Sequence, residues 1–164
     1  MTRIFLVALV LITAGLLVGC AGMMPADRNM QKEFTYDFQL PGKTQGDLWR
    51  IARDHFAESY GDSRSVFRVV DEKDGTFIGR GLAPWPLAGN VCTTEYHIRF
   101  AAKDGKARLQ YELIDGVPAL SPCTGWPWPS KDGYRQITDA FANNAKTLEL
   151  VLQGKSAKSK LKDF

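Results

Sequence analysis

The sequence has little of what motif-based enzymes need. Only two histidines, His55 and His97, occur in 164 residues, and a serine or cysteine nucleophile needs a base close to it. No paired-histidine zinc spacing, P-loop glycine pattern or G-x-S-x-G elbow is present. These absences exclude the hydrolases and nucleotide-binding enzymes that such motifs define, and we expect no cofactor. They leave open an enzyme built on other residues.

The chain also lacks a strong charge of one sign. Of 21 lysines and arginines, one (Arg3) lies in residues 1–19, which leaves 20 against 18 aspartates and glutamates, a net charge of +2. A nucleic-acid-binding protein needs a strongly basic face, so we expect no nucleic-acid partner. Four lysines gather in residues 155–164, which we expect to form a disordered basic tail. Such a tail can touch anionic lipid, with each lysine contributing about 1 kcal/mol.

Only one long apolar run is present, and it lies at the amino terminus. Arg3 is followed by uncharged, mostly apolar residues from Ile4 to Val18, and then by Gly19 and Cys20. This order is typical of an export signal, and its ending on Leu-Val-Gly-Cys resembles the lipobox of bacterial lipoproteins. The resemblance implies cleavage before Cys20 and a thioether link from Cys20 to diacylglycerol, with fatty acids such as palmitate. The alternative is an uncleaved membrane anchor, because about 20 apolar residues span a bilayer.

Both interpretations place the rest of the chain outside the cytoplasm. We therefore expect a lipid-anchored protein of the cell envelope. Ala21 after the cysteine resembles the outer-membrane sorting pattern, which implies an outer-membrane protein facing the periplasm if the source has two membranes. The predicted organisation is a signal peptide (1–19), the lipidated cysteine with a flexible tether (20–32), a single domain (33–154) and the basic tail (155–164).

Two cysteines remain after Cys20 has been assigned to lipid. Cys92 and Cys123 lie in a chain predicted to be exported, where disulfides persist, so we expect a bond between them. Closing this loop should stabilise the fold by roughly 3 to 4 kcal/mol in the chain-entropy model. The alternative is a pair of metal ligands, but the sequence offers them no nearby partners.

The spacing of apolar residues predicts a strand, a helix, four strands and a helix. Phe34, Tyr36 and Phe38 alternate with polar residues, the period of a half-buried strand. A helix is predicted to begin at a capping box at Thr44 and to end before Gly61, and a second helix is predicted between Ser130 and Gly154. The other strands are predicted at 66–70, 76–81, 93–101 and around 109–113, with irregular segments at 82–91 and 115–129.

Strands with one apolar face and helices with one apolar stripe bury these surfaces when both helices lie on one side of an antiparallel sheet. We therefore predict an α+β fold with a five-stranded antiparallel sheet and two helices on one face. Several short stretches support the same fold, namely residues 34–38, 48–49, 70–76, 79–81 and 103–114. Through them the chain resembles a bacterial domain of unknown function with a TATA-binding-protein-like fold. The resemblance covers about residues 33–150 and leaves out the two Pro/Trp-rich segments; its motifs are turns, so it implies a fold and no activity.

For each of the two histidines, a catalytic role is weighed against a structural one. His55 lies beside the apolar stripe of the first helix, where a partly buried structural histidine is the favoured interpretation. His97 lies between Glu95 and Arg99 on the polar face of a strand, a grouping that can tune a general base. The favoured interpretation is a solvated sheet face that carries cross-strand charge pairs.

Two segments rich in tryptophan and proline need a separate explanation. They are residues 84–86 (Pro-Trp-Pro) and residues 125–129 (Gly-Trp-Pro-Trp-Pro), and the strand directions place both at one end of the sheet, beside Cys92 and Cys123. Rigid aromatic groups on an ordered loop are typical of binding hot spots. The alternative is a lid over the core, which we favour slightly for Trp85, whereas exposure is favoured for Trp126 and Trp128.

These features favour a binding or scaffold module over an enzyme. The binding residues would be Trp85, Trp126 and Trp128, and the partner an envelope protein or a cell-wall glycan, whose sugar rings stack on tryptophan. The alternative function is an envelope hydrolase or transferase centred on Glu95, His97 and Arg99. A third possibility is a structural tether whose lysine tail touches lipid.

Overall fold

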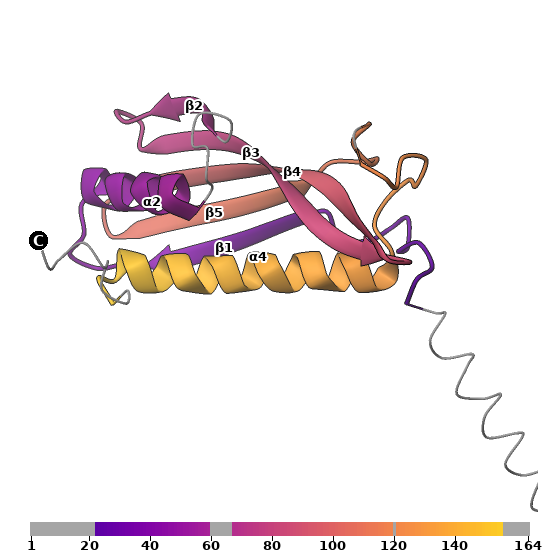
Figure 1. Cartoon of the computed structure of the whole chain (residues 1–164). Coiled ribbons are helices and arrows are strands. Elements are labelled where there is room, and N and C mark those ends of the chain that lie inside the picture. Colours follow the sequence, from indigo (N-terminus) through magenta and orange to yellow (C-terminus); the bar gives the residue numbers. More distant parts are fainter. Residues whose placement is uncertain (1–21, 60–66, 120, 156–164) are drawn as a thin grey trace, which may run out of the picture. The chain divides into compact units, whose positions relative to one another are not determined.

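The computed structural model describes residues 22–59, 67–119 and 121–155 (Figure 1). The predicted signal peptide, Cys20 and the tail beyond Lys155 lie outside these described residues. The elements are β1 (Glu33–Gln39), α2 (Gln45–Ser59), β2 (Phe67–Asp71), β3 (Thr76–Leu87), β4 (Asn90–Lys103), β5 (Lys106–Leu113) and α4 (Lys131–Leu152).

The strands form one antiparallel sheet in the order β1-β5-β4-β3-β2, which confirms the predicted fold class. The first strand therefore pairs with the last one, with Phe34 opposite Tyr111. At the other edge, the pairing of β2 with β3 is interrupted by a shift in register between Phe67 and Val69. Among the described residues, no helix is long and apolar enough to cross a membrane.

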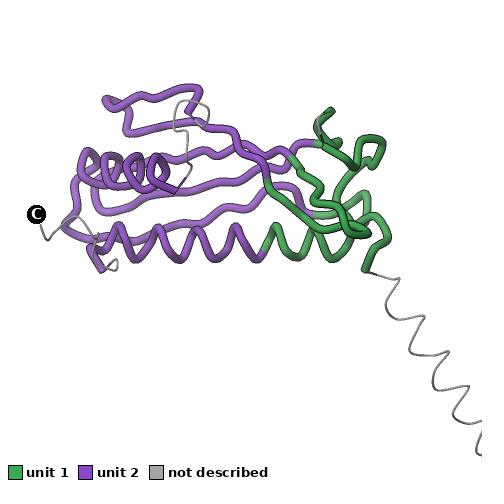
Figure 2. Tube along the Cα trace, in the orientation of Figure 1, with its two compact units in different colours: residues 1–30, 83–94, 115–138 green, residues 31–82, 95–114, 139–164 purple. Residues whose placement is uncertain are grey.

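The chain folds into two compact units (Figure 2). Unit 1 takes its described residues from 1–30, 83–94 and 115–138, and unit 2 takes its described residues from 31–82, 95–114 and 139–164. The strands β3 and β4 and the helix α4 contribute residues to both units. The predicted single domain, 33–154, thus contains two units, and unit 1 also includes residues that precede it.

Unit 2 contains an aromatic core between the sheet and both helices. On the sheet, the rings of Phe77 and Phe100 stack with centroids 5.0 Å apart. Phe56 of α2 lies edge-on to Phe77 at 5.5 Å, and Phe141 of α4 stacks on Tyr111 at 4.2 Å. These sheet residues point to one face, because side chains alternate along each strand. Both helices therefore cover the same side of the sheet, as predicted.

The helix starts follow the sequence signals. The backbone N–H of Asp47 donates to Thr44 Oγ1 at 3.2 Å, so Thr44 caps α2 as predicted. The Thr44 hydroxyl in turn donates to the Asp47 carboxylate, a side-chain pair in place of the reciprocal backbone bond of a full capping box. The N–H of Gly133 donates to the Ser130 hydroxyl at 3.1 Å, so Ser130 caps α4 as predicted. Gly154 has a φ of 74° just after α4 and ends it.

The hairpin between β3 and β4 differs from the prediction. The irregular segment expected at 82–91 is strand instead, and β3 continues through Pro84 and Pro86 to Leu87. Both prolines are exposed, whereas Trp85 between them is buried, so the strand alternation persists. The turn residues Ala88 and Gly89 both have positive φ, 47° and 82°. Such a two-residue turn fits the twist of a hairpin, but Ala-Gly is a weaker signal than Asn-Gly.

The segment expected to be a flexible tether, residues 20–32, also differs from the prediction. Within its described part, the N–H of Ala26 donates to the Pro129 carbonyl at 2.9 Å, and the N–H of Lys131 donates to the Met24 carbonyl at 2.9 Å. The N–H of Asp132 donates to the Gly22 carbonyl at 3.1 Å. Ala26 is buried, with 7% of its surface exposed. Residues 22–26 are therefore fixed along the start of α4 as part of unit 1.

Candidate functional site

A disulfide bond between Cys92 and Cys123 organises unit 1. The bond joins the start of β4 to the irregular segment before α4, with the two Cα atoms 5.5 Å apart. Both cysteines are buried. The Ser121 hydroxyl accepts bonds from the N–H groups of Thr93 (3.2 Å) and Cys123 (3.4 Å). The predicted disulfide is thus present, and it holds residues 121–123 against β4.

Trp85 is an internal residue of unit 1. Only 1% of its surface is exposed, and its indole Nε1–H donates to Thr94 Oγ1 at 2.9 Å. A Cβ placed on Gly133 would lie 2.9 Å from the Trp85 ring, so the start of α4 packs directly against it. The lid interpretation therefore describes Trp85. Its inclusion among the binding residues is corrected, because a ring this deeply buried cannot contact a partner.

Trp126 and Trp128 are half-buried, each beside another residue of unit 1. The ring of Trp126 lies 6.1 Å from that of Trp85, and the guanidinium of Arg28 lies 5.8 Å from the ring centre of Trp128. The N–H of Gly116 donates to the Pro127 carbonyl at 3.0 Å and holds the backbone between the two tryptophans. Other exposed apolar residues of unit 1 near these segments in the sequence include Pro84, Pro86, Val91, Pro122 and Pro127. We call these five residues, with Trp126 and Trp128, the Trp/Pro surface.

The second candidate surface is the sheet face of unit 2 that points away from the helices. Glu95 forms an ion pair with Arg80. Arg99 lies 2.7 Å from Glu112, whose carboxylate is also 3.7 Å from His97 Nδ1. These are cross-strand charge pairs on a solvated sheet, which is the interpretation favoured from the sequence. The structure thus pairs the three residues of the enzyme hypothesis with charged neighbours.

His55 has surroundings that suit a structural histidine. It is half-buried on α2, with its ring 5.7 Å from that of Phe56. Burial lowers the pKa of His55 below its ordinary value of 6.5, because the charged imidazolium loses solvation. In the part of the chain that the structure describes, no three His, Cys, Asp or Glu side chains cluster closely enough to hold a metal ion.

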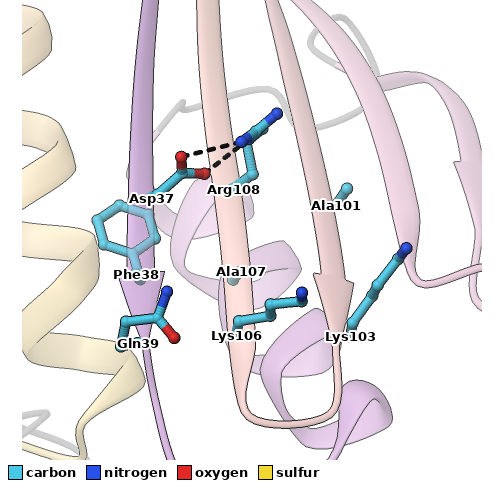
Figure 3. Close-up of a pocket in the computed structure, with 8 residues that line it drawn as sticks. All are labelled: Asp37, Phe38, Gln39, Ala101, Lys103, Lys106, Ala107 and Arg108. Atoms are coloured by element: carbon cyan, nitrogen blue, oxygen red, sulfur yellow. Dashed lines mark hydrogen bonds and ion pairs between the residues drawn. The ribbon is translucent and has the colours of Figure 1, made fainter.

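A shallow hollow of about 410 Å³ lies on the same outer sheet face (Figure 3). Asp37 accepts two hydrogen bonds from Arg108, at 2.6 and 2.9 Å. This bidentate pair holds the pKa of the Asp37 carboxyl below its ordinary value of 3.8. The hollow is lined by Asp37, Phe38, Gln39, Ala101, Lys103, Lys106, Ala107 and Arg108.

The hollow has an excess of positive charge. Lys103 and Lys106 are directly opposite each other in the register of β4 and β5 and are both exposed. Two like charges at such a position destabilise a sheet, and an anion between them would relieve the repulsion. The sequence did not predict this hollow. The available signal was Ala101, a small residue at an outward position among long polar side chains.

The comparisons with known proteins agree on the fold. A crystal structure of a TBP-like protein from Parabacteroides distasonis is similar with a TM-score of 0.55 and 11% identity, covering 84% of this chain and 99% of that one. A crystal structure of a DUF4468 family protein from Bacteroides ovatus is similar with a TM-score of 0.54 and 17% identity, covering 85% and 94%. At these identities the likeness shows the fold alone. A comparison with curated protein sequences found no match.

The family comparison is more specific. A family model described as a domain of unknown function (DUF4468) with TBP-like fold matches residues 34–115. The match is shorter than the 33–150 expected: it includes Trp85 and Cys92 but ends before Cys123, Trp126 and α4. The Trp85 segment thus lies inside the family pattern, contrary to our expectation, and the second Trp/Pro segment lies outside it. The chain belongs to the family of domains of unknown function with a TBP-like fold that this model describes.

Proposed function

We propose that this chain is a lipid-anchored protein of the cell envelope that acts by binding a partner rather than by catalysis. Its anchor would be the diacylglycerol on Cys20, as the lipobox-like sequence implies. In a source with two membranes it would face the periplasm from the outer membrane. The partner would be an envelope protein or a cell-wall glycan. The observation that carries the proposal is the Trp/Pro surface, held in place by the Cys92–Cys123 disulfide.

The construction of unit 1 favours binding because its surface is ordered before a partner arrives. The disulfide fixes residues 121–123, the buried ring of Trp85 supports Trp126, and a backbone hydrogen bond holds Pro127. Proline also restricts its own backbone. A surface that is already ordered loses little conformational entropy on association, and tryptophan is enriched among the residues that dominate binding energy.

The outer sheet face gives less support to catalysis. A catalytic histidine is oriented by a partner within hydrogen-bond reach, about 2.6 to 3.2 Å between heavy atoms. His97 Nδ1 lies 3.7 Å from the carboxylate of Glu112, and that carboxylate is closer to Arg99, at 2.7 Å. Glu95 is paired with Arg80. Stabilisation of the sheet by these pairs therefore accounts for Glu95, His97 and Arg99 without a catalytic role.

A photo-crosslinking experiment in cells tests the proposal. A benzophenone amino acid at Pro127, which is exposed between the two tryptophans, leaves both rings intact. The matched control carries it at Asn143, which is exposed on α4 in unit 2. We expect a discrete product from position 127 and none from 143. Equal products at both positions, or none at either, would contradict the Trp/Pro surface as a binding site.

The anchor is tested separately by labelling cells with a radioactive or clickable fatty acid. We expect the label on the wild-type chain and its loss in Cys20→Ser. Label that persists in this variant would contradict the lipid at Cys20 and leave the binding surface as a separate question.

A further inference from the structure

Residues 22–26 are hydrogen-bonded to the rest of unit 1, and this limits the distance between the domain and a lipid on Cys20. The backbone carbonyls of Gly22 and Met24 accept hydrogen bonds from the first two residues of α4, and the N–H of Ala26 donates to Pro129, two residues before the helix. An isolated bridge between Pro25 and Ser130 adds to this pairing. The position of Gly22 is therefore fixed in unit 1.

Only one residue, Ala21, lies between Cys20 and Gly22, so two Cα-to-Cα steps join them. An extended chain spans about 3.3 to 3.6 Å per residue, so Cys20 lies within about 7 Å of Gly22. A free tether of residues 20–32 would have reached roughly 40 Å by the same measure. If Cys20 carries lipid, the surface of the bilayer must come close to the fixed start of unit 1.

The residues at this point suit a membrane interface. Met23 and Met24 are 45% and 59% exposed, and methionine is an apolar, flexible side chain.

We propose that unit 1 rests on the bilayer, with Met23 and Met24 inserted into the interface. The proposal rests on the lipid anchor of the proposed function and adds a partner surface that the anchor alone does not require. The partner of this surface is the bilayer itself, because the chain between Cys20 and Gly22 is too short to hold unit 1 away from the membrane.

The test uses the full-length lipidated protein in vesicles of phosphatidylethanolamine and phosphatidylglycerol. An environment-sensitive fluorophore is attached at Met24→Cys, and at Asn143→Cys as the control on unit 2. The native cysteines do not compete, since Cys20 would carry lipid and the other two form the disulfide. Brominated lipids then report which label enters the bilayer.

We expect the label at position 24 to be quenched at least about twofold more strongly than the label at 143, because an interfacial apolar group is buried roughly 5 to 10 Å into the boundary between headgroups and acyl chains. A second variant inserts ten Gly/Ser residues between Ala21 and Gly22. This insertion lengthens the reach by about 30 Å and should reduce the quenching at position 24.

Three results would overturn the inference. A label at position 24 that stays in water, with fatty acid present on Cys20, would remove the membrane-resting surface and leave the anchor intact. Equal quenching at positions 24 and 143 would also contradict the membrane-resting surface, because the label at position 24 would then be no deeper in the bilayer than the label at position 143. Absence of fatty acid from Cys20 would overturn the anchor and this inference together.

Discussion

Replacing Gly133 by alanine should destabilise the fold, although the same change stabilises most helices. Gly133 is the third residue of α4, and alanine in a helix is favoured over glycine by roughly 0.5 to 1 kcal/mol. The new methyl group would meet three atoms of Trp85 at 2.9 to 3.0 Å. Trp85 is 1% exposed and hydrogen-bonded to Thr94, so the ring has little room to shift.

The magnitude follows from these two opposing effects. Overpacking a closed site costs about 1 to 3 kcal/mol, which on average exceeds the helix gain and leaves a net loss of about 1 kcal/mol. Gly46 provides the matched control. It is the second residue of α2, and a Cβ built there meets no atom within 4 Å. Gly46→Ala should therefore stabilise the protein by up to about 1 kcal/mol.

Urea unfolding followed by circular dichroism measures both changes, as shifts of the midpoint with an unchanged slope. A second substitution, Trp85→Phe, tests the cause. The smaller ring should reduce the cost of Gly133→Ala, and the double-mutant cycle should show a coupling of about 0.5 kcal/mol or more. Stabilisation by Gly133→Ala equal to that by Gly46→Ala would refute the contact with Trp85, as would strict additivity in the cycle.

Three further predictions concern the disulfide, the half-buried His55 and the lysine pair. Replacing Cys92 and Cys123 together by alanine should lower the free energy of unfolding by about 3 to 4 kcal/mol; a urea midpoint unchanged from the wild type would contradict this. The pKa of His55 is lower in the folded state than the 6.5 of an exposed histidine, so the unfolded state binds the proton first and stability should fall as the pH drops below about 6.5. His55→Gln should remove this part of the loss, seen as a smaller drop in Tm between pH 7.5 and pH 5, and an identical drop in both proteins would count against it. Lys103→Glu should stabilise the fold by about 0.2 to 1 kcal/mol through a new pair with Lys106, an effect that high salt should weaken; destabilisation at low salt would be the opposite result.

The fold could be predicted because its elements carry signals that act locally. Alternation along Phe34, Tyr36 and Phe38 requires a strand with one buried face, and Thr44 and Ser130 satisfy the first N–H groups of the two helices. The length of β3 could not be predicted in this way. Pro84 and Pro86 are usually strand breakers, but here each occupies an exposed position in a strand whose buried residues include Trp85.

The site was harder to predict because its contacts are made by the backbone. The docking of residues 22–26 depends on carbonyl and N–H groups that every residue type except proline provides in full. Such pairing leaves no pattern in the sequence, and the composition of the segment favoured a tether. The disulfide was predictable because only two cysteines remained. The depth of Trp85 was predicted only by a slight preference for the lid, since a tryptophan between two prolines also fits a binding surface.

The open sheet has a further consequence for a protein held at a surface. Strands β1 and β2 are its two edges, and unpaired edges can join those of another copy. Anchoring would concentrate the copies in two dimensions and increase such encounters. The shift in register within the five-residue β2 limits this risk, because a short, irregular edge is a poor template for a further strand. The register shift between Phe67 and Val69 would then help to keep neighbouring lipid-anchored molecules separate on a crowded membrane.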